Sequence, residues 1–184
     1  GHALVALSVP TGEPVHKISI IPRGVAALGY TMQLPVEEKF LSTEAELQDQ
    51  LAILLGGRVA EEAVFGDVSS GAANDLERAS EIAREMVTRL GMSEELGPLT
   101  WGRRQQSPYL GGNYVDEQNY SEETARMIDN SVRALVEQSH DRARDIVQNR
   151  RAALDALAAL LQEKEVINGE EARHIVAAHP VSPG

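Results

Sequence analysis

Residues 43–66 read TEAELQDQLAILLGGRVAEEAVFG and predict one long helix. Thr43 and Glu46 have the spacing of a capping box, in which each side chain satisfies a free backbone N–H at the start of a helix. Phe65 and Gly66 end the helix, because glycine readily takes the left-handed conformation at a helix C-terminus. The Leu-Leu-Gly-Gly run in the middle costs about 1 kcal/mol of helix stability for each glycine. The usual compensation is the close approach of another backbone, so we expect a second segment to pack against these glycines.

The rest of the chain is also expected to be mainly helical. Apolar residues make up 42% of it and aromatic residues only 4%, so the core must be built from Leu, Ile, Val and Ala, which favours packed helices. We predict a mainly α fold with one small β-sheet near the N-terminus, in one domain over residues 1–179 followed by a disordered tail at 180–184. Capping signals and apolar periodicity predict further helices at about residues 2–9, 73–90, 121–148, 150–164 and 168–178. The alternation of β-branched residues predicts strands at 15–21 and 28–33, joined through a turn at 22–24. Irregular segments are expected at 34–42 and 92–119.

Charge and composition exclude several classes of function. The chain has 184 residues and a net charge of −11, which argues against nucleic acid as a partner. It contains no cysteine, so disulfides and thiolate metal sites are excluded. No apolar run reaches the roughly 20 residues that a membrane-spanning helix requires. We therefore expect the chain as given to be soluble.

A zinc site in this chain would have to be built from histidines and acids. His2 is followed by the small and apolar residues of a buried helix, as is the second histidine of the zinc-protease motif His-Glu-x-x-His, although an N-terminal Gly-His is also typical of a cloning remnant. His16 precedes an apolar strand, where a partly buried strand-edge position explains it. His140 stands beside two charged residues on a long helix, which indicates a surface face. His174 and His179 are five residues apart, a poor spacing for one helical face.

Three acidic residues are candidates for such a site. Asp75 lies at the start of a predicted helix, where free N–H groups and the helix dipole favour an acid, so a structural role explains it fully and a metal role is the alternative. Glu61 and Glu62 lie together on an Ala-rich helical stretch. Such a pair usually has one solvated and one paired carboxylate, but an acid that faces the site could instead orient a zinc-binding histidine through a hydrogen bond.

A series of short segments runs through the chain in a fixed order: GHALVA (1–6), VHKISIIPRG (15–24), ALGYT (27–31), GGRVAEE (56–62), SGAANDLERA (70–79), GMS (91–93) and NYSEETA (119–125). One such segment would be a weak signal, but their order and separations together are specific. Over roughly residues 1–178 the chain resembles the peptidase domain of the FtsH family of membrane-anchored, ATP-dependent zinc metalloproteases.

The resemblance implies one Zn²⁺ per chain, with His2 as the second histidine of the motif His-Glu-Ala-Gly-His and Asp75 as the third protein ligand. It also implies that the first zinc histidine and the general-base glutamate both precede residue 1. In the intact enzyme, zinc would lower the pKa of its bound water to about 7 and polarise the scissile carbonyl, while the glutamate moves the proton. We therefore expect a zinc endopeptidase domain that, as the 184-residue chain alone, is proteolytically inactive.

The resemblance further implies a homo-hexamer that degrades unfolded polypeptides, both membrane proteins and short-lived soluble proteins, in protein quality control. ATP would act only through an ATPase module whose Gly-x-x-x-x-Gly-Lys-Ser/Thr loop does not occur in these residues. A membrane anchor, also outside these residues, would hold the intact bacterial protein at the inner membrane on the cytoplasmic side. The strand pair at 15–33 would either offer substrate an edge for β-pairing or steady the zinc helix. The alternative function is a catalytically inactive hexamer-assembly module of the same fold.

Overall fold

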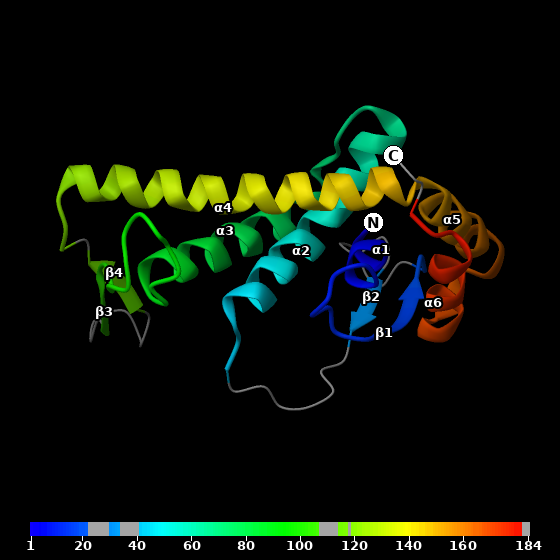
Figure 1. Ribbon diagram of the computed structural model, residues 1–184, viewed down its shortest axis with the longest axis horizontal. Helices are drawn as coiled ribbons and strands as arrows, with labels where there is room; N and C mark the ends of the chain where they lie inside the picture. The colour runs from blue at the N-terminus through cyan, green and yellow to red at the C-terminus, as the bar shows by residue number, and fades with distance from the viewer. Residues whose placement is uncertain (22–29, 34–40, 107–113, 118, 182–184) are drawn as a thin grey trace.

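The computed structural model describes residues 1–21, 30–33, 41–106, 114–117 and 119–181 (Figure 1). The helices are α1 (His2–Ala6), α2 (Glu44–Phe65), α3 (Ala73–Thr88), α4 (Glu122–Asn149), α5 (Arg151–Lys164) and α6 (Gly169–Ala178), with a short 3₁₀ helix, η1 (Ser70–Ala72). The strands are β1 (Val15–Ser19), β2 (Tyr30–Gln33), β3 (Arg103–Gln106), β4 (Tyr114–Glu117) and β5 (Val166–Asn168). The predicted mainly helical fold with a small sheet near the N-terminus is confirmed.

Helix α2 forms as the sequence predicts and lies at the centre of the molecule. The Thr43 hydroxyl accepts a hydrogen bond from the Glu46 N–H, and the Glu46 carboxylate accepts one from the Thr43 N–H, which completes the capping box. Gly66 ends the helix in the left-handed conformation, with φ at 69°. Helices α1, α3 and α4 all pack against α2, and α4 runs along the length of the molecule (Figure 1).

The two glycines in the middle of α2 are where α1 rests on it. A Cβ atom on Gly56 would lie 2.9 Å from Val5 Cγ2 and 3.2 Å from the Gly1 carbonyl oxygen. A Cβ atom on Gly57 would lie 2.3 Å from Cε1 of His2. Because such distances are shorter than van der Waals contact, only glycine lets α1 come this near. The close approach predicted from the Leu-Leu-Gly-Gly run is therefore confirmed.

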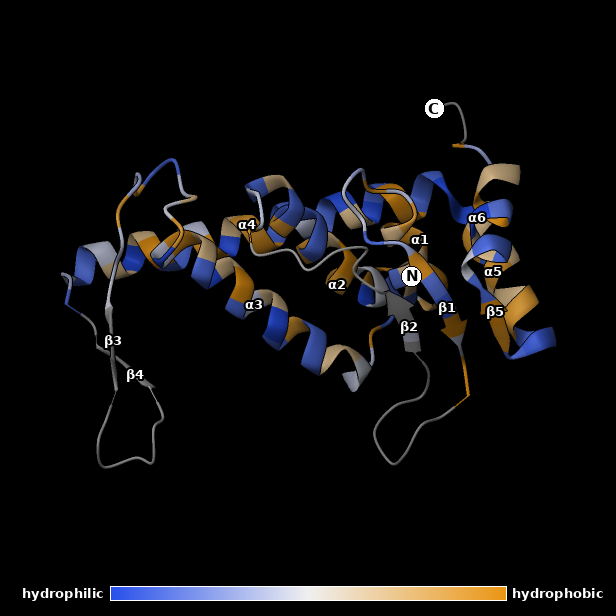
Figure 2. Cartoon of the chain, turned by 90° about the horizontal axis from the view of Figure 1, so that it is seen from below, coloured by the Kyte–Doolittle hydropathy of each residue, from blue (hydrophilic) through white to orange (hydrophobic). Residues whose placement is uncertain are grey.

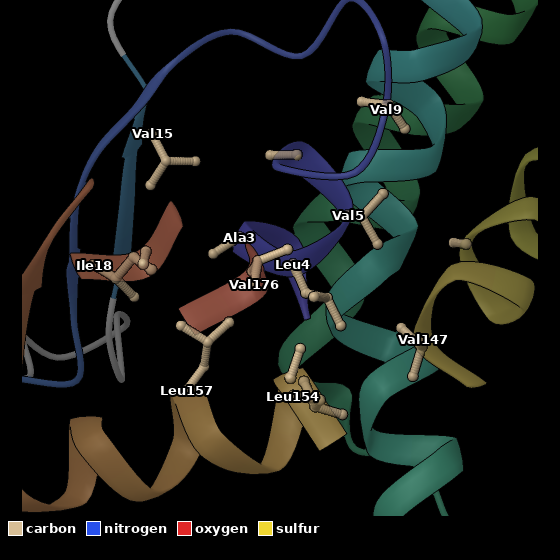
Figure 3. Packing of buried hydrophobic residues seen from close by; sticks show 14 of the residues in the cluster. Ala3, Leu4, Val5, Val9, Val15, Ile18, Val147, Leu154, Leu157 and Val176 are labelled. Carbon is tan, nitrogen blue, oxygen red and sulfur yellow. The ribbon is translucent and has the colours of Figure 1, made fainter. Parts of the chain in front are cut away.

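Two groups of buried apolar side chains form the core. The first joins α1, β1, β5, α5 and α6, and Figure 3 shows Leu154 and Leu157 of α5 pointing toward Leu4 of α1. The second lies among α2, α3 and α4, where Met86 and Ile128 are buried. Figure 2 shows apolar and polar residues on different sides of α3 and α4, as expected for helices with one buried face. Helices α2 and α4 contribute to both groups and so join the two halves of the molecule.

The N-terminal sheet has the strand order β2-β1-β5, and both pairings are antiparallel. Its third strand comes from the C-terminal part of the chain, where Ile167 pairs with Ile18 of β1 and both side chains are buried. A strand of three residues carries too little periodicity for a sequence pattern to predict it.

A second sheet, formed by β3 and β4, lies at the opposite end of the molecule (Figure 1). The expectation of an irregular segment over 92–119 is wrong for these two strands. Their sequences, RRQQ and YVDE, lack the alternation of apolar and polar residues that identifies a strand. The N-terminal helix is also shorter than the predicted 2–9, since α1 ends at Ala6.

Several predicted features lie wholly or partly outside the described residues. These are the turn at 22–24, the first residues of the second strand at 28–29, most of the loop at 34–42, and the last three residues of the tail at 180–184. Among the helices that the structure does describe, none combines the length and the apolar character needed to cross a bilayer.

Candidate metal centre

Two side chains of the kind that bind zinc meet beside α2. His2 Nε2 lies 3.0 Å from Asp75 Oδ2, although the two residues are 73 positions apart in the sequence. The His2 side chain is 38% exposed and the Asp75 side chain 28% exposed, so the pair is accessible from solvent. Imidazole nitrogen and carboxylate oxygen are both common zinc donors in proteins. The pair lies where the two apolar groups meet, because α1 belongs to the first and α3 to the second.

The position of the His2 ring is set by the packing of α1 on α2. Helix α1 is only five residues long, too short to be stable alone, and the residues after His2 are buried in the first apolar group. The Val5 N–H donates to the Gly1 carbonyl oxygen at 3.0 Å, which continues the helical turn through His2. The ring itself lies against Gly57, where any side chain would collide with it. This packing directs Nε2 toward α3.

Asp75 lies in the first turn of α3, and a hydrogen-bonded loop fixes the start of that helix. The Ser69 N–H donates to the Glu61 carboxylate at 2.9 Å, and the Ser69 hydroxyl donates to it at 3.0 Å. The same hydroxyl accepts a hydrogen bond from the Gly71 N–H at 3.1 Å. Glu61 therefore ties the loop before α3 back to α2. The Asp75 carboxylate hydrogen-bonds to His2 rather than to the backbone of its own helix.

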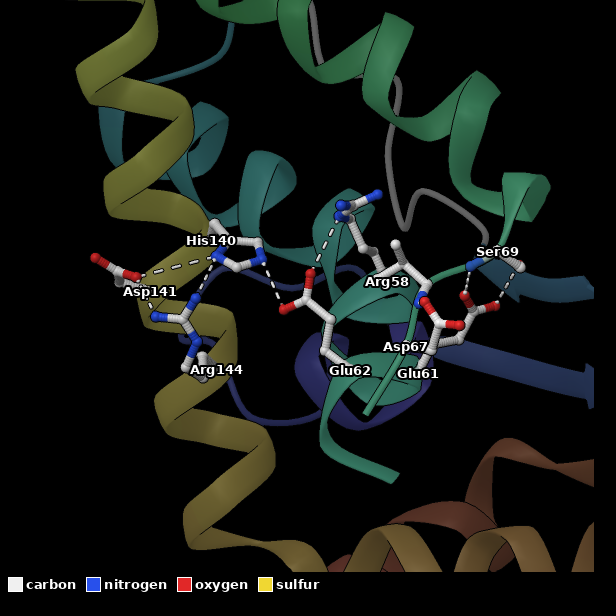
Figure 4. A network of polar contacts seen from close by, with 9 residues as sticks. Arg58, Glu61, Glu62, Asp67, Ser69, His140, Asp141 and Arg144 are labelled. Carbon is white, nitrogen blue, oxygen red and sulfur yellow. Dashed lines mark hydrogen bonds and ion pairs between the residues drawn. The ribbon is translucent and has the colours of Figure 1, made fainter. Parts of the chain in front are cut away.

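Glu61 and Glu62 hold different parts of the structure together, as Figure 4 shows. Glu62 Oε1 lies 3.2 Å from Arg58 Nε, and its Oε2 lies 3.4 Å from His140 Nε2, which joins α2 to α4. His140 is 20% exposed, so it lies only partly on the surface face that its neighbours indicated. One nitrogen of its imidazole faces Glu62 on α2, and the other faces its charged neighbours Asp141 and Arg144 on α4. Neither glutamate hydrogen-bonds to His2, so their contribution is to hold α2, α4 and the loop in place.

The other histidines lie away from the pair. His16 is exposed on β1 and His174 is exposed on α6. His179 Nδ1 lies 2.9 Å from the Ile175 carbonyl oxygen at the end of α6. In the described part of the chain, no group of three or more His, Asp or Glu side chains is placed to hold a metal ion. His2 and Asp75 thus fit two positions of a tetrahedral zinc site, whose other positions need donors from outside the described residues or from solvent.

The residues that support the pair are harder to recognise from the sequence than the pair itself. The Ser-Ser-Gly run at 69–71 is typical of a helix start, which was a usable signal. Its partner Glu61, eight residues away from Ser69, follows no spacing rule. The contact between His140 and Glu62 depends on how α4 packs on α2, which no local pattern specifies.

Comparison with known proteins shows which family this chain is similar to. The sequence pattern of peptidase family M41 matches residues 1–175. A protein of Methylococcus capsulatus named ATP-dependent zinc metalloprotease FtsH is 67% identical over 96% of this chain and 28% of its own length. A protein of the same name from Thermotoga maritima is 56% identical over 96% of this chain and 29% of its own. ATP-dependent zinc metalloprotease FtsH 4 of Synechocystis is 51% identical over 96% of this chain and 28% of its own. The chain therefore spans less than a third of the length of these curated relatives.

Proposed function

The chain belongs to peptidase family M41, the family of the FtsH proteases, and we propose on this basis that residues 1–179 form the proteolytic domain of an ATP-dependent zinc metalloprotease. The observation that carries the proposal is the His2–Asp75 contact, which brings a nitrogen donor and an oxygen donor to 3.0 Å. The relatives are named zinc metalloproteases, and these are donor types that zinc takes. The alternative of an inactive assembly module gains no support, because both donors are present and in contact.

In this proposal His2 and Asp75 hold the zinc ion. When bound, zinc supplies a water whose pKa is lowered to about 7 and polarises the carbonyl of the scissile peptide bond. His2 must offer a neutral imidazole nitrogen, and its packing on Gly57 keeps the ring turned toward Asp75. Glu61 restrains the loop before α3, which limits the movement of Asp75.

The remaining parts of the reaction belong in this proposal to the intact protease. The resemblance assigns the first zinc histidine and the general-base glutamate to positions before residue 1. Unfolded polypeptides are the proposed substrates, and an ATPase module is the proposed site of ATP. A homo-hexamer at the bacterial inner membrane, with its peptidase domains on the cytoplasmic side, is the proposed assembly.

Metal analysis of the intact protease tests the proposal. We expect about one zinc per chain in the wild type and loss of that zinc in Asp75→Asn, because a neutral amide is a much weaker zinc ligand than a carboxylate. Peptidase activity should disappear with the zinc, while ATP hydrolysis should largely remain.

The matched control is Glu77→Gln, which removes an exposed carboxylate two positions along the same helix. This variant should keep both its zinc and its peptidase activity. Equal zinc in the wild type and in Asp75→Asn would remove Asp75 from the metal site. A wild-type protein without zinc would refute the proposed function.

A further inference from the structure

Gly1 lies where α1 meets α2, directly before the candidate zinc ligand His2. A Cβ atom on Gly1 would overlap the Gly56 carbonyl oxygen and would lie 2.7 Å from the Cβ atom of Ala60. Carbon atoms that are not bonded to one another pack about 3.5–4.0 Å apart, so α2 leaves no room for a side chain here. Gly1 is otherwise exposed, so the restriction at this position comes from α2.

The atom that obstructs a side chain at Gly1 belongs to the backbone of α2. Gly56 is a buried residue in the middle of that helix, where the hydrogen bond to the amide four residues on fixes the direction of each carbonyl. A side chain can avoid a collision by changing its rotamer, but a helix carbonyl cannot. The approach is also reciprocal, because a Cβ atom on Gly56 would lie 3.2 Å from the Gly1 carbonyl oxygen. Any side chain at position 1 must therefore move α1 away from α2.

A movement of Gly1 is carried directly to His2. The Gly1 carbonyl oxygen accepts the Val5 N–H at 3.0 Å, so Gly1 is part of the first turn of α1. His2 Nε2 lies 3.0 Å from Asp75 Oδ2, but Asp75 is held by α3, which belongs to the other apolar group. Moving α1 away from α2 therefore changes the position of the nitrogen donor relative to the oxygen donor. Because a metal site needs its donor distances within about 0.2 Å, a small shift of α1 is enough to weaken the site.

Gly1 belongs to the family pattern rather than to a cloning remnant. The sequence pattern of peptidase family M41 matches from residue 1 onward. A remnant would also have no reason to fit the backbone of α2 so closely that glycine alone is accommodated. The close approach of two backbones is a common reason for glycine at a given position.

We propose that Gly1 is a positioning residue of the zinc site, because its lack of a side chain sets the separation of α1 from α2 at which His2 and Asp75 can hold one zinc ion. Gly1 contributes no atom to the metal and acts only through the place it gives to His2. This inference rests on the proposed function, because the pair must bind zinc for the position of its nitrogen donor to matter.

Gly1→Ala in the intact protease tests this role. We expect its zinc affinity, measured by competition with a chromophoric chelator, to fall at least about tenfold, as it does when a group that orients a metal ligand is lost. With Co²⁺ in place of zinc, the visible absorption bands should change, because they report the coordination geometry. With zinc at saturation, kcat for a short peptide should fall at least about tenfold while KM changes little, because a displaced ligand disturbs the transition state more than the binding of the peptide.

Gly169→Ala is the matched control. A Cβ atom on Gly169 would overlap the Val15 carbonyl oxygen, so this variant also forces a glycine away from a backbone carbonyl, but between α6 and β1. Its thermal unfolding midpoint should fall, while its zinc affinity, its cobalt spectrum and its kcat at saturating zinc should stay at the wild-type values. Equal losses of zinc affinity in Gly1→Ala and Gly169→Ala would show that Gly1 matters only for stability and would overturn the proposal.

The outcomes separate this inference from the proposed function. Zinc that is present in the wild type and lost in Asp75→Asn, but bound by folded Gly1→Ala with wild-type affinity and cobalt spectrum, would overturn the role of Gly1 and leave the peptidase function standing. A wild-type protease without zinc would overturn both. If Gly1→Ala does not fold, as judged by circular dichroism, Ala60→Val decides, because it adds two methyl groups on α2 opposite Gly1. Ala60→Val should lower the zinc affinity and change the cobalt spectrum, and wild-type values of both would overturn the proposal.

Discussion

Gly57 determines how closely the His2 ring can lie to α2, and this makes it the most informative single residue near the candidate centre. An alanine there would place a Cβ atom 2.3 Å from His2 Cε1, so the ring would have to move. We expect the zinc affinity of Gly57→Ala in the intact protease to fall at least about tenfold, as it does when a group that orients a metal ligand is lost. Competition with a chromophoric zinc chelator measures this affinity.

Gly56→Ala is the comparison for this prediction. It gains the same helix propensity, about 1 kcal/mol, but its Cβ atom would meet Val5 Cγ2 at 2.9 Å and not the ring. It should therefore destabilise the contact of α1 with α2 and lower the zinc affinity less than Gly57→Ala does. Wild-type zinc affinity in Gly57→Ala would show that the ring position does not matter for the metal.

Asp49 is a buried carboxylate on α2, and its loss should lower the stability of the fold. Asp49→Asn removes a buried charge and leaves Arg142 without its carboxylate partner. Hydrogen bonds to charged groups contribute about 1.5–3 kcal/mol, so we expect the free energy of unfolding to fall by that amount. Urea titration followed by the fluorescence of Trp101, the only tryptophan, measures it. Asp129→Asn, at a side chain that is 64% exposed, should change the same quantity by less than about 0.5 kcal/mol.

The sequence singled out His2 and Asp75, which the structure brings into contact, but it did not indicate the residues that hold them in place. His2 and Asp75 stand inside segments whose spacing carries the resemblance, and the structure brings their side chains together. Asp49 bonds to Thr11 across 38 residues, and the local sequence around either residue contains no sign of that contact. Such hydrogen bonds depend on which helix faces meet, which is a property of the folded molecule.

Among the elements, helices with capping signals were predictable and short strands were not. The boxes that begin at Thr43 and Asn168 place the starts of α2 and α6 within one residue, because a cap is a local hydrogen-bond pattern. Strand β5 depends instead on β1, since Ile167 pairs with Ile18 from the other end of the chain. Strand pairing at such a separation leaves no mark in three residues of sequence.

The stability that Glu171 gives to the start of helix α6 should depend on pH. Glu171 accepts the backbone N–H of Asn168 and pairs with Lys164 of α5. The hydrogen bond with Lys164 holds the pKa of Glu171 below its ordinary value of 4.5, and the bond to Asn168 adds to this. Because this pKa is lower in the folded chain, the carboxylate stabilises the fold above about pH 4.5, and the contribution is lost as the pH falls through the folded pKa.

Glu171→Gln keeps a side chain that can complete the capping box but removes the charge. We expect its thermal unfolding midpoint to lie below that of the wild type at neutral pH, and the two midpoints to converge in acid. Glu170→Gln, in the same turn, should show a smaller difference. A gap between Glu171→Gln and the wild type that stays constant down to acid pH would show that the ion pair is not its cause.

Over the whole molecule, the candidate centre depends on two apolar groups at once. His2 is held by α1 in the first group and Asp75 by α3 in the second, and α2 and α4 belong to both. Composition predicted that the core would be aliphatic and helical, because aromatic residues are only 4% of the chain. It did not predict two groups, since that division follows from which faces of α2 and α4 are covered by which partners.

The largest-scale prediction concerns residues 1–184 expressed alone. Both apolar groups are built from these residues, so we expect a helical circular dichroism spectrum and cooperative unfolding. In the proposed function His2 and Asp75 supply two metal donors, and the described residues place no third donor beside them. The resemblance assigns the general base to a position before residue 1. We therefore expect weaker zinc binding than in the intact protease and no chelator-sensitive cleavage of casein with zinc supplied. The intact protease is the positive control for that assay. Zinc-dependent cleavage by residues 1–184 that Asp75→Asn abolishes would contradict the prediction and place a general base within these residues.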